Sequence, residues 1–240
     1  FDGLFIDNVH PETECYGPEH GKHGHLNPDK NNADTYKMLL SQIRPLVKSY
    51  GQDKAVVLNS GGVRKEYFPY GDALMWESYI FGGAERRHDW NRSKQAAEEL
   101  KPYIESGKAL LALSYVGGET PEQRKDNAFY AYACARLSGF LWARFSTFDK
   151  VRLGMPIGDI QEQDGVYYRI HSKGLVAVNP ESTDKRVQIP VGSDYSLLLD
   201  LYSNETFQTF SFSKRKSLDG LLDVYVPANS GRAYILTLVN

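Results

Sequence analysis

FDGLFIDN, at residues 1–8, contains the pattern from which the fold of this chain can be worked out. Residues 3–6 form a short apolar run, which is typical of a strand buried on both faces of a parallel sheet. The run stops at Asp7 and Asn8, and a long polar segment follows. Barrels and open sheets of the α/β class place their chemistry at the carboxyl ends of such strands. Asp7 is therefore a candidate for chemistry, although an Asp that only caps the following turn would give the same pattern.

The same arrangement recurs through the first 150 residues. Four more apolar runs predict buried strands, at residues 55–58, 73–76, 109–113 and 140–143. The first three of these runs end in polar residues, Asn59, Glu77 and Ser114. Polar residues thus follow strand after strand on what should be one edge of the sheet.

Helices are predicted between these strands. Apolar residues recur at helical spacing over about 36–50, 91–104 and 121–137. Pro45 should kink or shorten the first helix. Thr120-Pro121-Glu122-Gln123 carries a helix start, with Thr at the N-cap, Pro at the first helical position and Gln three residues after the cap.

Alternating strands and helices predict a parallel sheet covered by helices over residues 1–150. Four or five strands do not close a barrel, and an open part of one would leave exposed edges and an unfilled interior. We therefore expect a partial barrel, with about three β/α units preceding Phe1. A half-barrel that self-associates is the alternative.

From about Val151 the pattern changes to short β-type runs separated by turn residues, without helical periodicity. The expected strands lie at 166–171, 174–179, 186–189, 197–202, 206–212, 221–226 and 233–238. Residues 151–240 are thus predicted to form a C-terminal antiparallel β-sandwich domain. We expect it to pack against the last helices and to carry no catalytic group.

Composition narrows the classes of partner. The formal net charge of −2 does not favour nucleic acid or an anionic membrane as the main partner. No apolar run is long enough to span a membrane, and no signal peptide is visible. Cys15 and Cys134 show no metal-ligand spacing, so we expect two free thiols. Aromatic residues make up 12% of the chain, which suits a sugar-binding cleft as well as an ordinary core.

Asp7 and Glu77 form the candidate catalytic pair. They end strands separated by one other strand, so their Cα atoms should lie roughly 10 Å apart on the same edge. Inward-pointing side chains would bring the carboxyl groups to about 5 to 9 Å, the range used by glycosidases. Acid and base roles need two different environments, and Trp76 and Tyr79 would give Glu77 an apolar wall. The alternative is two structural carboxylates bonded to Arg or to the backbone.

Three segments resemble one family. FDGLFIDNV at residues 1–9 resembles FDG(V/L)F(I/L)D, the fourth-strand motif of TIM-barrel glycoside hydrolases. Among these hydrolases, the sequence most resembles the hypothetical glycosyl-hydrolase-like families and the endo-α-1,4-polygalactosaminidases. It more distantly resembles the α-amylase and α-galactosidase barrels. MWE at residues 75–77 resembles their sixth-strand acid, and YRIHSKGLVAVNP at residues 168–180 resembles the start of their C-terminal β domain.

The resemblance implies a fold and two roles. Residues 1–150 would be about strands 4–8 of a (β/α)8 TIM barrel, the catalytic domain, followed by the β domain. Asp7 would be the nucleophile or general base and Glu77 the general acid, with no cofactor. Because strands one to three would be absent, the activity of this chain by itself stays open.

Further polar and aromatic residues are candidate sugar contacts. These substrate-binding candidates are Asn8, His10, His25, Asn59, Trp76, Tyr79 and Tyr115. The His-rich loop offers a competing metal site, since imidazole and carboxylate suit Zn²⁺. Its ligands would come from His10, His20, His23, His25, Glu12, Glu14 and Glu19. No helical spacing fixes their geometry, so we expect no metal there.

The sequence thus predicts a glycoside hydrolase that cleaves an oligo- or polysaccharide with a paired Asp/Glu mechanism. One alternative is a catalytically inert carbohydrate-binding protein, and another is a metal-dependent hydrolase that uses the His-rich loop. Carbohydrate is the expected partner, and a polysaccharide hydrolase would be secreted or periplasmic. Sugar, linkage, stereochemical outcome and oligomeric state do not follow from the sequence.

Overall fold

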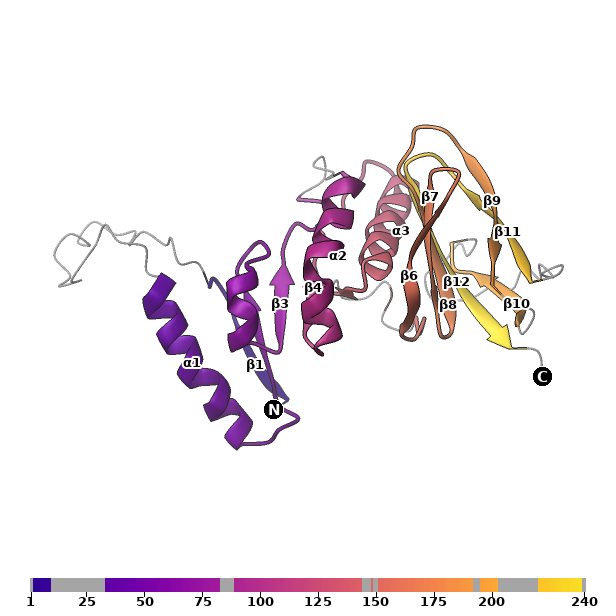
Figure 1. The fold of residues 1–240 in the computed structure, drawn as a ribbon. Helices are drawn as coiled ribbons and strands as arrows, with labels where there is room; N and C mark the ends of the chain where they lie inside the picture. The colour runs from indigo at the N-terminus through magenta and orange to yellow at the C-terminus, as the bar shows by residue number, and fades with distance from the viewer. Residues whose placement is uncertain are drawn as a thin grey trace. The chain divides into compact units, whose positions relative to one another are not determined.

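The structure is a computed structural model that describes residues 2–9, 33–82, 89–143, 148, 151–191, 195–202 and 220–238. Helices and strands alternate in the first half of the chain, and strands alone follow in the second (Figure 1). The elements of the first half are β1 (Gly3–Ile6), α1 (Ala33–Ser49), β2 (Ala55–Asn59), the 3₁₀ helix η2 (Lys65–Tyr70), β3 (Ala73–Trp76), α2 (Trp90–Glu105), β4 (Ala109–Ala112), α3 (Pro121–Leu137) and β5 (Leu141–Trp142). Those of the second half are β6 (Pro156–Gln163), β7 (Val166–His171), β8 (Gly174–Asn179), β9 (Lys185–Pro190), β10 (Tyr195–Asp200), β11 (Leu221–Val226) and β12 (Ser230–Leu238).

The first sheet has five strands in the order β1-β2-β3-β4-β5. β1 pairs with β2 in parallel, with Ile6 opposite Leu58, and β2 pairs with β3 in parallel. Gly3 permits this close pairing, because a Cβ built on it would lie 2.2 Å from the carbonyl oxygen of Ala55. A parallel sheet in a mixed α/β chain is confirmed. Which part of a barrel it represents stays a prediction.

The three helices lie where the periodicity predicted them. Pro45 is accommodated inside α1, which continues to Ser49. The start of α3 has the expected capping box: the Thr120 hydroxyl accepts a hydrogen bond from the Gln123 N–H at 3.1 Å, and the Gln123 side chain accepts one from the Thr120 N–H at 3.3 Å. Each bond satisfies a backbone donor that the helix itself leaves unpaired.

The second half forms antiparallel sheets, as the sequence predicted. One has the order β10-β12-β8-β7-β6, and the other pairs β11 with β9. Side chains from both sheets form one apolar core. Its members are Val166, Tyr168, Leu175, Ala177, Val187, Ile189, Val191, Leu222, Val224, Val226, Tyr234 and Leu236. The strand expected at 206–212 lies outside the described residues, and the sandwich architecture stays a prediction.

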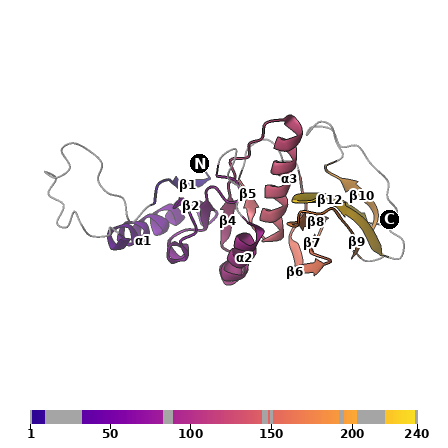
Figure 2. The ribbon, with the colours of Figure 1, turned by 90° about the horizontal axis from the view of Figure 1, so that it is seen from above.

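The five-stranded antiparallel sheet packs on α3, which stands beside β7, β8 and β12 in both views (Figures 1 and 2). Gly231 of β12 approaches the helix closely. A Cβ on it would lie 2.7 Å from the Ala133 Cβ and 2.8 Å from the carbonyl oxygen of Phe129. Only a residue without a side chain fits between β12 and this helix. The expected packing of the β part against the last helix is therefore confirmed.

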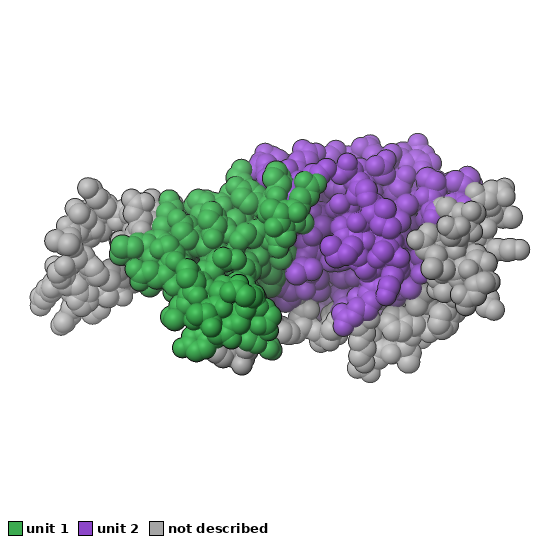
Figure 3. Space-filling view, turned by 60° about the horizontal axis from the view of Figure 1, so that its bottom comes forward, with its two compact units in different colours: residues 1–77, 102–111 green, residues 78–101, 112–240 purple. Residues whose placement is uncertain are grey.

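The chain divides into two compact units, coloured separately in Figure 3. The first contains residues 1–77 and 102–111, and the second contains residues 78–101 and 112–240. The second unit includes α3 as well as the antiparallel sheets. The domain division at residue 150 stays a prediction.

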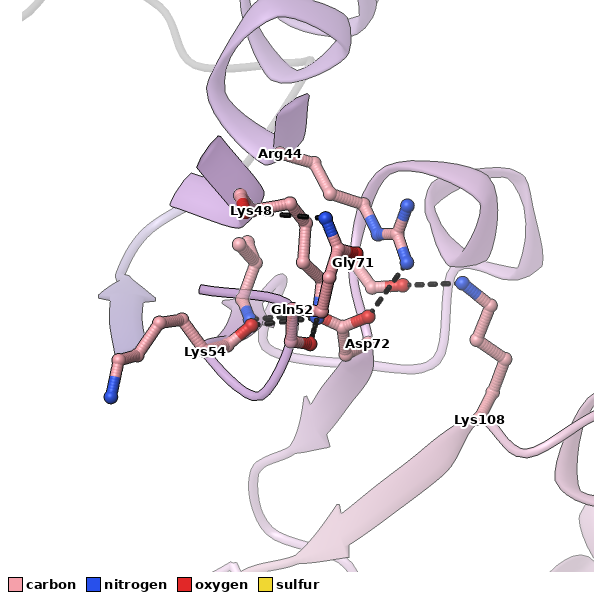
Figure 4. A network of polar contacts seen from close by, with 8 residues as sticks. Arg44, Lys48, Gln52, Lys54, Gly71, Asp72 and Lys108 are labelled. Atoms are coloured by element: carbon pink, nitrogen blue, oxygen red, sulfur yellow. Dashed lines mark hydrogen bonds and ion pairs between the residues drawn. The ribbon is translucent and has the colours of Figure 1, made fainter. Parts of the chain in front are cut away.

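A polar cluster at the amino edge of the first sheet anchors α1 (Figure 4). The carboxylate of Asp72, just before β3, accepts hydrogen bonds from Arg44 at 2.8 Å and from the Val56 N–H at 2.9 Å. Lys48 lies 3.1 Å from the same carboxylate. Partial burial opposes the ionisation of Asp72, but the Val56 N–H and the two cations outweigh it and lower its pKa. The polar side chains at this edge therefore have a structural role, which is to hold α1 against the sheet.

Candidate functional site

Asp7 emerges from β1 at the opposite, carboxyl edge of the sheet. Its side chain is exposed, yet one oxygen is held: the Asn59 amide nitrogen donates to Asp7 Oδ1 at 2.7 Å. The other oxygen, Oδ2, accepts only a long contact of 3.4 Å from the Asn8 side chain. Among the described residues, the carboxylate is thus held by a short bond at one oxygen and by a longer contact at the other.

Glu77 follows β3 directly and leaves the sheet at the same edge. Ile6 pairs with Leu58 and Asn59 pairs with Met75, so Asp7, the residue after Ile6, is level with Met75. Glu77 therefore lies two residues further along its strand direction than Asp7 does. Its side chain is partly buried, and its backbone N–H donates to the carbonyl of Gly61 at 3.0 Å. The parallel register thus places both carboxylates at one edge, as expected. The distance between the two carboxyl groups stays a prediction.

The residue after each carboxylate has an unusual backbone conformation. Asn8 has φ of 55° and Ser78 has φ of 56°, in the left-handed region. Asn adopts this region fairly readily, whereas for Ser it is less common. Residues held in this way cluster at functional sites. At Glu77 and Ser78 the chain forms a turn directly after β3.

Asn59 connects these features. It is 4% exposed, and while its nitrogen donates to Asp7, its side-chain oxygen accepts the Gly61 N–H at 3.0 Å. Its own carbonyl accepts the Val9 N–H at 2.8 Å. The sequence identified Asn59 as a candidate sugar contact but gave no sign of its link to Asp7, because that link depends on the register of two strands far apart in the chain.

The aromatic candidates differ in exposure. Trp76 is 4% exposed and Tyr79 is completely buried, so both rings belong to the core in this structure. The Tyr79 hydroxyl lies 3.2 Å from the Ser138 hydroxyl, and burial raises the pKa of Tyr79. Tyr115, in the second unit, is 49% exposed, and its N–H donates to the carbonyl of Phe81 at 3.0 Å. Tyr115 is thus the most exposed of the three aromatic candidates.

The loop candidates His10 and His25, like the rest of the His-rich segment and Cys15, lie outside the described residues. In the part of the chain that the structure describes, no three His, Cys, Asp or Glu side chains are grouped as metal ligands would be. Cys134 is a buried free thiol on α3. None of the described helices combines the length and apolar character needed to cross a membrane.

Comparison with known proteins gives a likeness of fold. No protein-family model matches the chain, and no curated protein matches its sequence. Among solved structures, it is similar to α-galactosidase I from Mortierella vinacea, with a TM-score of 0.53 and 11% identity over 98% of this chain and 68% of that one. It is also similar to a family 27 β-L-arabinopyranosidase from Geobacillus stearothermophilus, with a TM-score of 0.51 and 7% identity over 84% of this chain and 54% of that one.

The chain therefore has a glycoside hydrolase-like fold, and it spans between about half and two thirds of the length of these two enzymes. The likeness extends across the parallel sheet and the antiparallel sheets together, since nearly all of the chain is covered in one of the comparisons. The expected family of TIM-barrel glycoside hydrolases agrees with this result at the level of fold. Membership of the polygalactosaminidase family stays a prediction.

Proposed function

We propose that this chain carries the paired carboxylates of a glycoside hydrolase, with Asp7 and Glu77 acting on opposite sides of a glycosidic bond. The observation that carries the proposal is the parallel β1-β2-β3 ladder, which delivers both carboxylates to the carboxyl edge of one sheet. In α/β proteins this is the edge where ligands bind.

The spacing is compatible with such a pair. Two strand intervals and a two-residue offset separate the Cα atoms by roughly 10 Å across the strands and roughly 7 Å along them. Glu77 has the longer side chain and starts further along, so the carboxyl groups approach if both side chains lean inward. Glycosidases use carboxyl separations of about 5 Å when they retain anomeric configuration and about 6.5 to 9.5 Å when they invert it.

The two carboxylates are assigned different roles. Asp7 is exposed and its carboxylate is oriented by Asn59, so we assign it the attack on the anomeric carbon or the proton transfer from water. Glu77 follows β3 at the same edge, and we assign it the proton transfer to the leaving oxygen. The leaving sugar then departs as an alcohol, and water completes the hydrolysis.

The fold likeness supports the reaction class. The two similar enzymes are named for α-galactosides and β-L-arabinopyranosides, so the first substrates to try are pyranosides of this kind. We propose carbohydrate as the partner of this chain, and within the second unit the exposed ring of Tyr115 suits the apolar face of a sugar.

The test compares Asp7→Asn and Glu77→Gln with the parent on a panel of chromogenic pyranosides. Each variant is nearly isosteric but loses the proton transfer or nucleophile, so turnover should fall by about a thousandfold or more. Sugar binding, measured by calorimetry, should stay within about tenfold, or about 1.4 kcal/mol. Glu98→Gln, on the exposed side of α2, is the matched control and should leave both quantities unchanged.

Other results would redirect the assignment. Turnover as fast as the parent's in both variants would make these carboxylates structural. A parent that binds oligosaccharide without cleaving it would be an inert carbohydrate-binding protein. Turnover that a chelator abolishes would point to the metal-dependent alternative.

A further inference from the structure

Asn59 has an amide whose orientation is set by its neighbours. Its side-chain oxygen faces the Gly61 N–H, and its side-chain nitrogen faces the Asp7 carboxylate. A flipped amide would place oxygen against the Asp7 carboxylate oxygen and nitrogen against the Gly61 N–H, which are two repulsive contacts. Because Asn59 is also almost completely buried, it has one acceptable orientation.

This fixed amide restrains a carboxylate that is otherwise exposed. Asp7 lies beyond the last paired residue of β1, where its side chain would be free to rotate. The 2.7 Å bond to Oδ1 holds the carboxylate by one oxygen, while Oδ2 has the longer 3.4 Å contact with the Asn8 side chain. A hydrogen bond to an ionised acceptor is roughly twice as strong as a neutral one, so the restraint is substantial.

The same amide is also linked, through Gly61, to the backbone of Glu77. Gly61 donates its N–H to Asn59 and accepts the Glu77 N–H on its carbonyl. Gly61 has φ of 73°, a left-handed conformation that suits glycine and points its two backbone groups to these partners. A continuous series of hydrogen bonds therefore runs from the Asp7 carboxylate to the backbone of Glu77.

We propose that Asn59 is a positioning residue, which orients the Asp7 carboxylate and fixes the turn that carries Glu77, and does not bind sugar itself. The catalytic consequence rests on the function proposed above, whereas the contact between Asn59 and Asp7 can be tested without it. A side chain that orients a reacting group affects the chemical step more than it affects substrate binding.

Kinetics distinguish positioning from sugar binding. Asn59→Ala should lower kcat by about a hundredfold, because a small misplacement of a reacting group has an effect of that size. Its KM for a pyranoside that the parent cleaves should stay within about threefold. Ser60→Ala is the matched control, because Ser60 follows Asn59 in the chain and is also buried, at 2% exposed. The substitution removes the hydrogen bond that the Ser60 hydroxyl donates to the Gly62 carbonyl. It should leave kcat and KM nearly unchanged.

Nuclear magnetic resonance tests the contact without any substrate. In the parent, the Asn59 side-chain NH₂ group should show one downfield, slowly exchanging proton, and in Asp7→Ala this proton should move upfield and exchange about tenfold faster or more. A resonance that does not respond would overturn the proposal, as would a raised KM with an unchanged kcat in Asn59→Ala. A parent that cleaves no pyranoside would count against the proposed function, while the resonance would still decide the role of Asn59.

Discussion

His171 is a buried titratable residue whose ionisation should affect the stability of the protein. Its ring is completely buried on β7, and Nδ1 donates to the carbonyl of Gly154 at 3.2 Å, so the neutral ring carries its proton there. Burial lowers the pKa of His171 from 6.5 to about 4, and the guanidinium groups of Arg136 and Arg169 act in the same direction. The folded protein therefore holds this ring neutral at pH values where the unfolded chain protonates it.

The sign of the pH dependence follows from this difference. Below pH 6.5 the unfolded chain takes up a proton that the folded protein refuses, so the free energy of unfolding falls as the pH decreases toward 4. Between pH 7 and pH 5 we expect a loss of about 2 kcal/mol from this residue. The free energy of unfolding of the parent and of His171→Asn, measured by urea denaturation at pH 7 and pH 5, checks this prediction. The variant should lose most of this dependence, and an equal dependence in both proteins would contradict the assignment.

At the residue scale, the sequence predicted which residues lie at the carboxyl edge of the sheet, but it did not predict their hydrogen-bond partners. Asp7 and Glu77 were placed at one sheet edge from the strand pattern alone, and the register agrees. The bond from Asn59 to Asp7 could not be predicted, because it depends on the alignment of strands about fifty residues apart. The burial of Tyr79 was also missed, since it lies beyond the end of a strand, where periodicity no longer reports on exposure.

At the scale of elements, apolar periodicity was sufficient for most helices and strands. The strands at 166–171, 174–179 and 221–226 were predicted with the bounds that the structure shows. β6 was missed because its sequence, PIGDIQEQ, is polar and mostly exposed along a sheet edge. An edge strand has one neighbour and little burial, so its sequence lacks the apolar alternation that identifies buried strands.

The amino-edge cluster provides a prediction about how elements are held together. Asp72→Asn removes the charge that Arg44 and Lys48 share, and it weakens the acceptor for the Val56 N–H. We expect a loss of about 1 to 2 kcal/mol in the free energy of unfolding, since the group is only partly buried. Urea denaturation at pH 7 measures it.

A matched control lies nearby on the same unit. Asp53 is exposed and pairs only with the neighbouring Lys54 among the ion pairs of the described residues, so Asp53→Asn should leave the urea midpoint unchanged. If both variants behave alike, the Asp72 cluster is an ordinary surface ion pair and α1 is held by apolar packing alone.

At the scale of the whole second unit, α3 and the antiparallel sheets are joined by more than one kind of contact. Tyr202, after β10, donates a hydrogen bond to Asp126 of α3 at 2.5 Å. The guanidinium group of Arg232, on β12, lies 3.6 Å from the centre of the Tyr202 ring. Arg169 of β7 donates to the carbonyl of Leu137 at the end of α3, at 3.1 Å. These contacts, with the close approach at Gly231, indicate that helix and sheets unfold together.

Gly231→Ala tests this cooperativity. The added methyl group would overlap Ala133 and the backbone of α3, so β12 must shift, and overpacking of this kind should cost about 2 kcal/mol. If the unit is cooperative, hydrogen exchange should accelerate by a similar factor in the backbone amides of α3 and in those of β8. Gly62→Ala is the control, because a Cβ on Gly62 would have no neighbour within 4 Å. Faster exchange in β8 with unchanged protection in α3 would show instead that the sheets open independently, and the helix would then be a support on which they rest rather than part of the same folding unit.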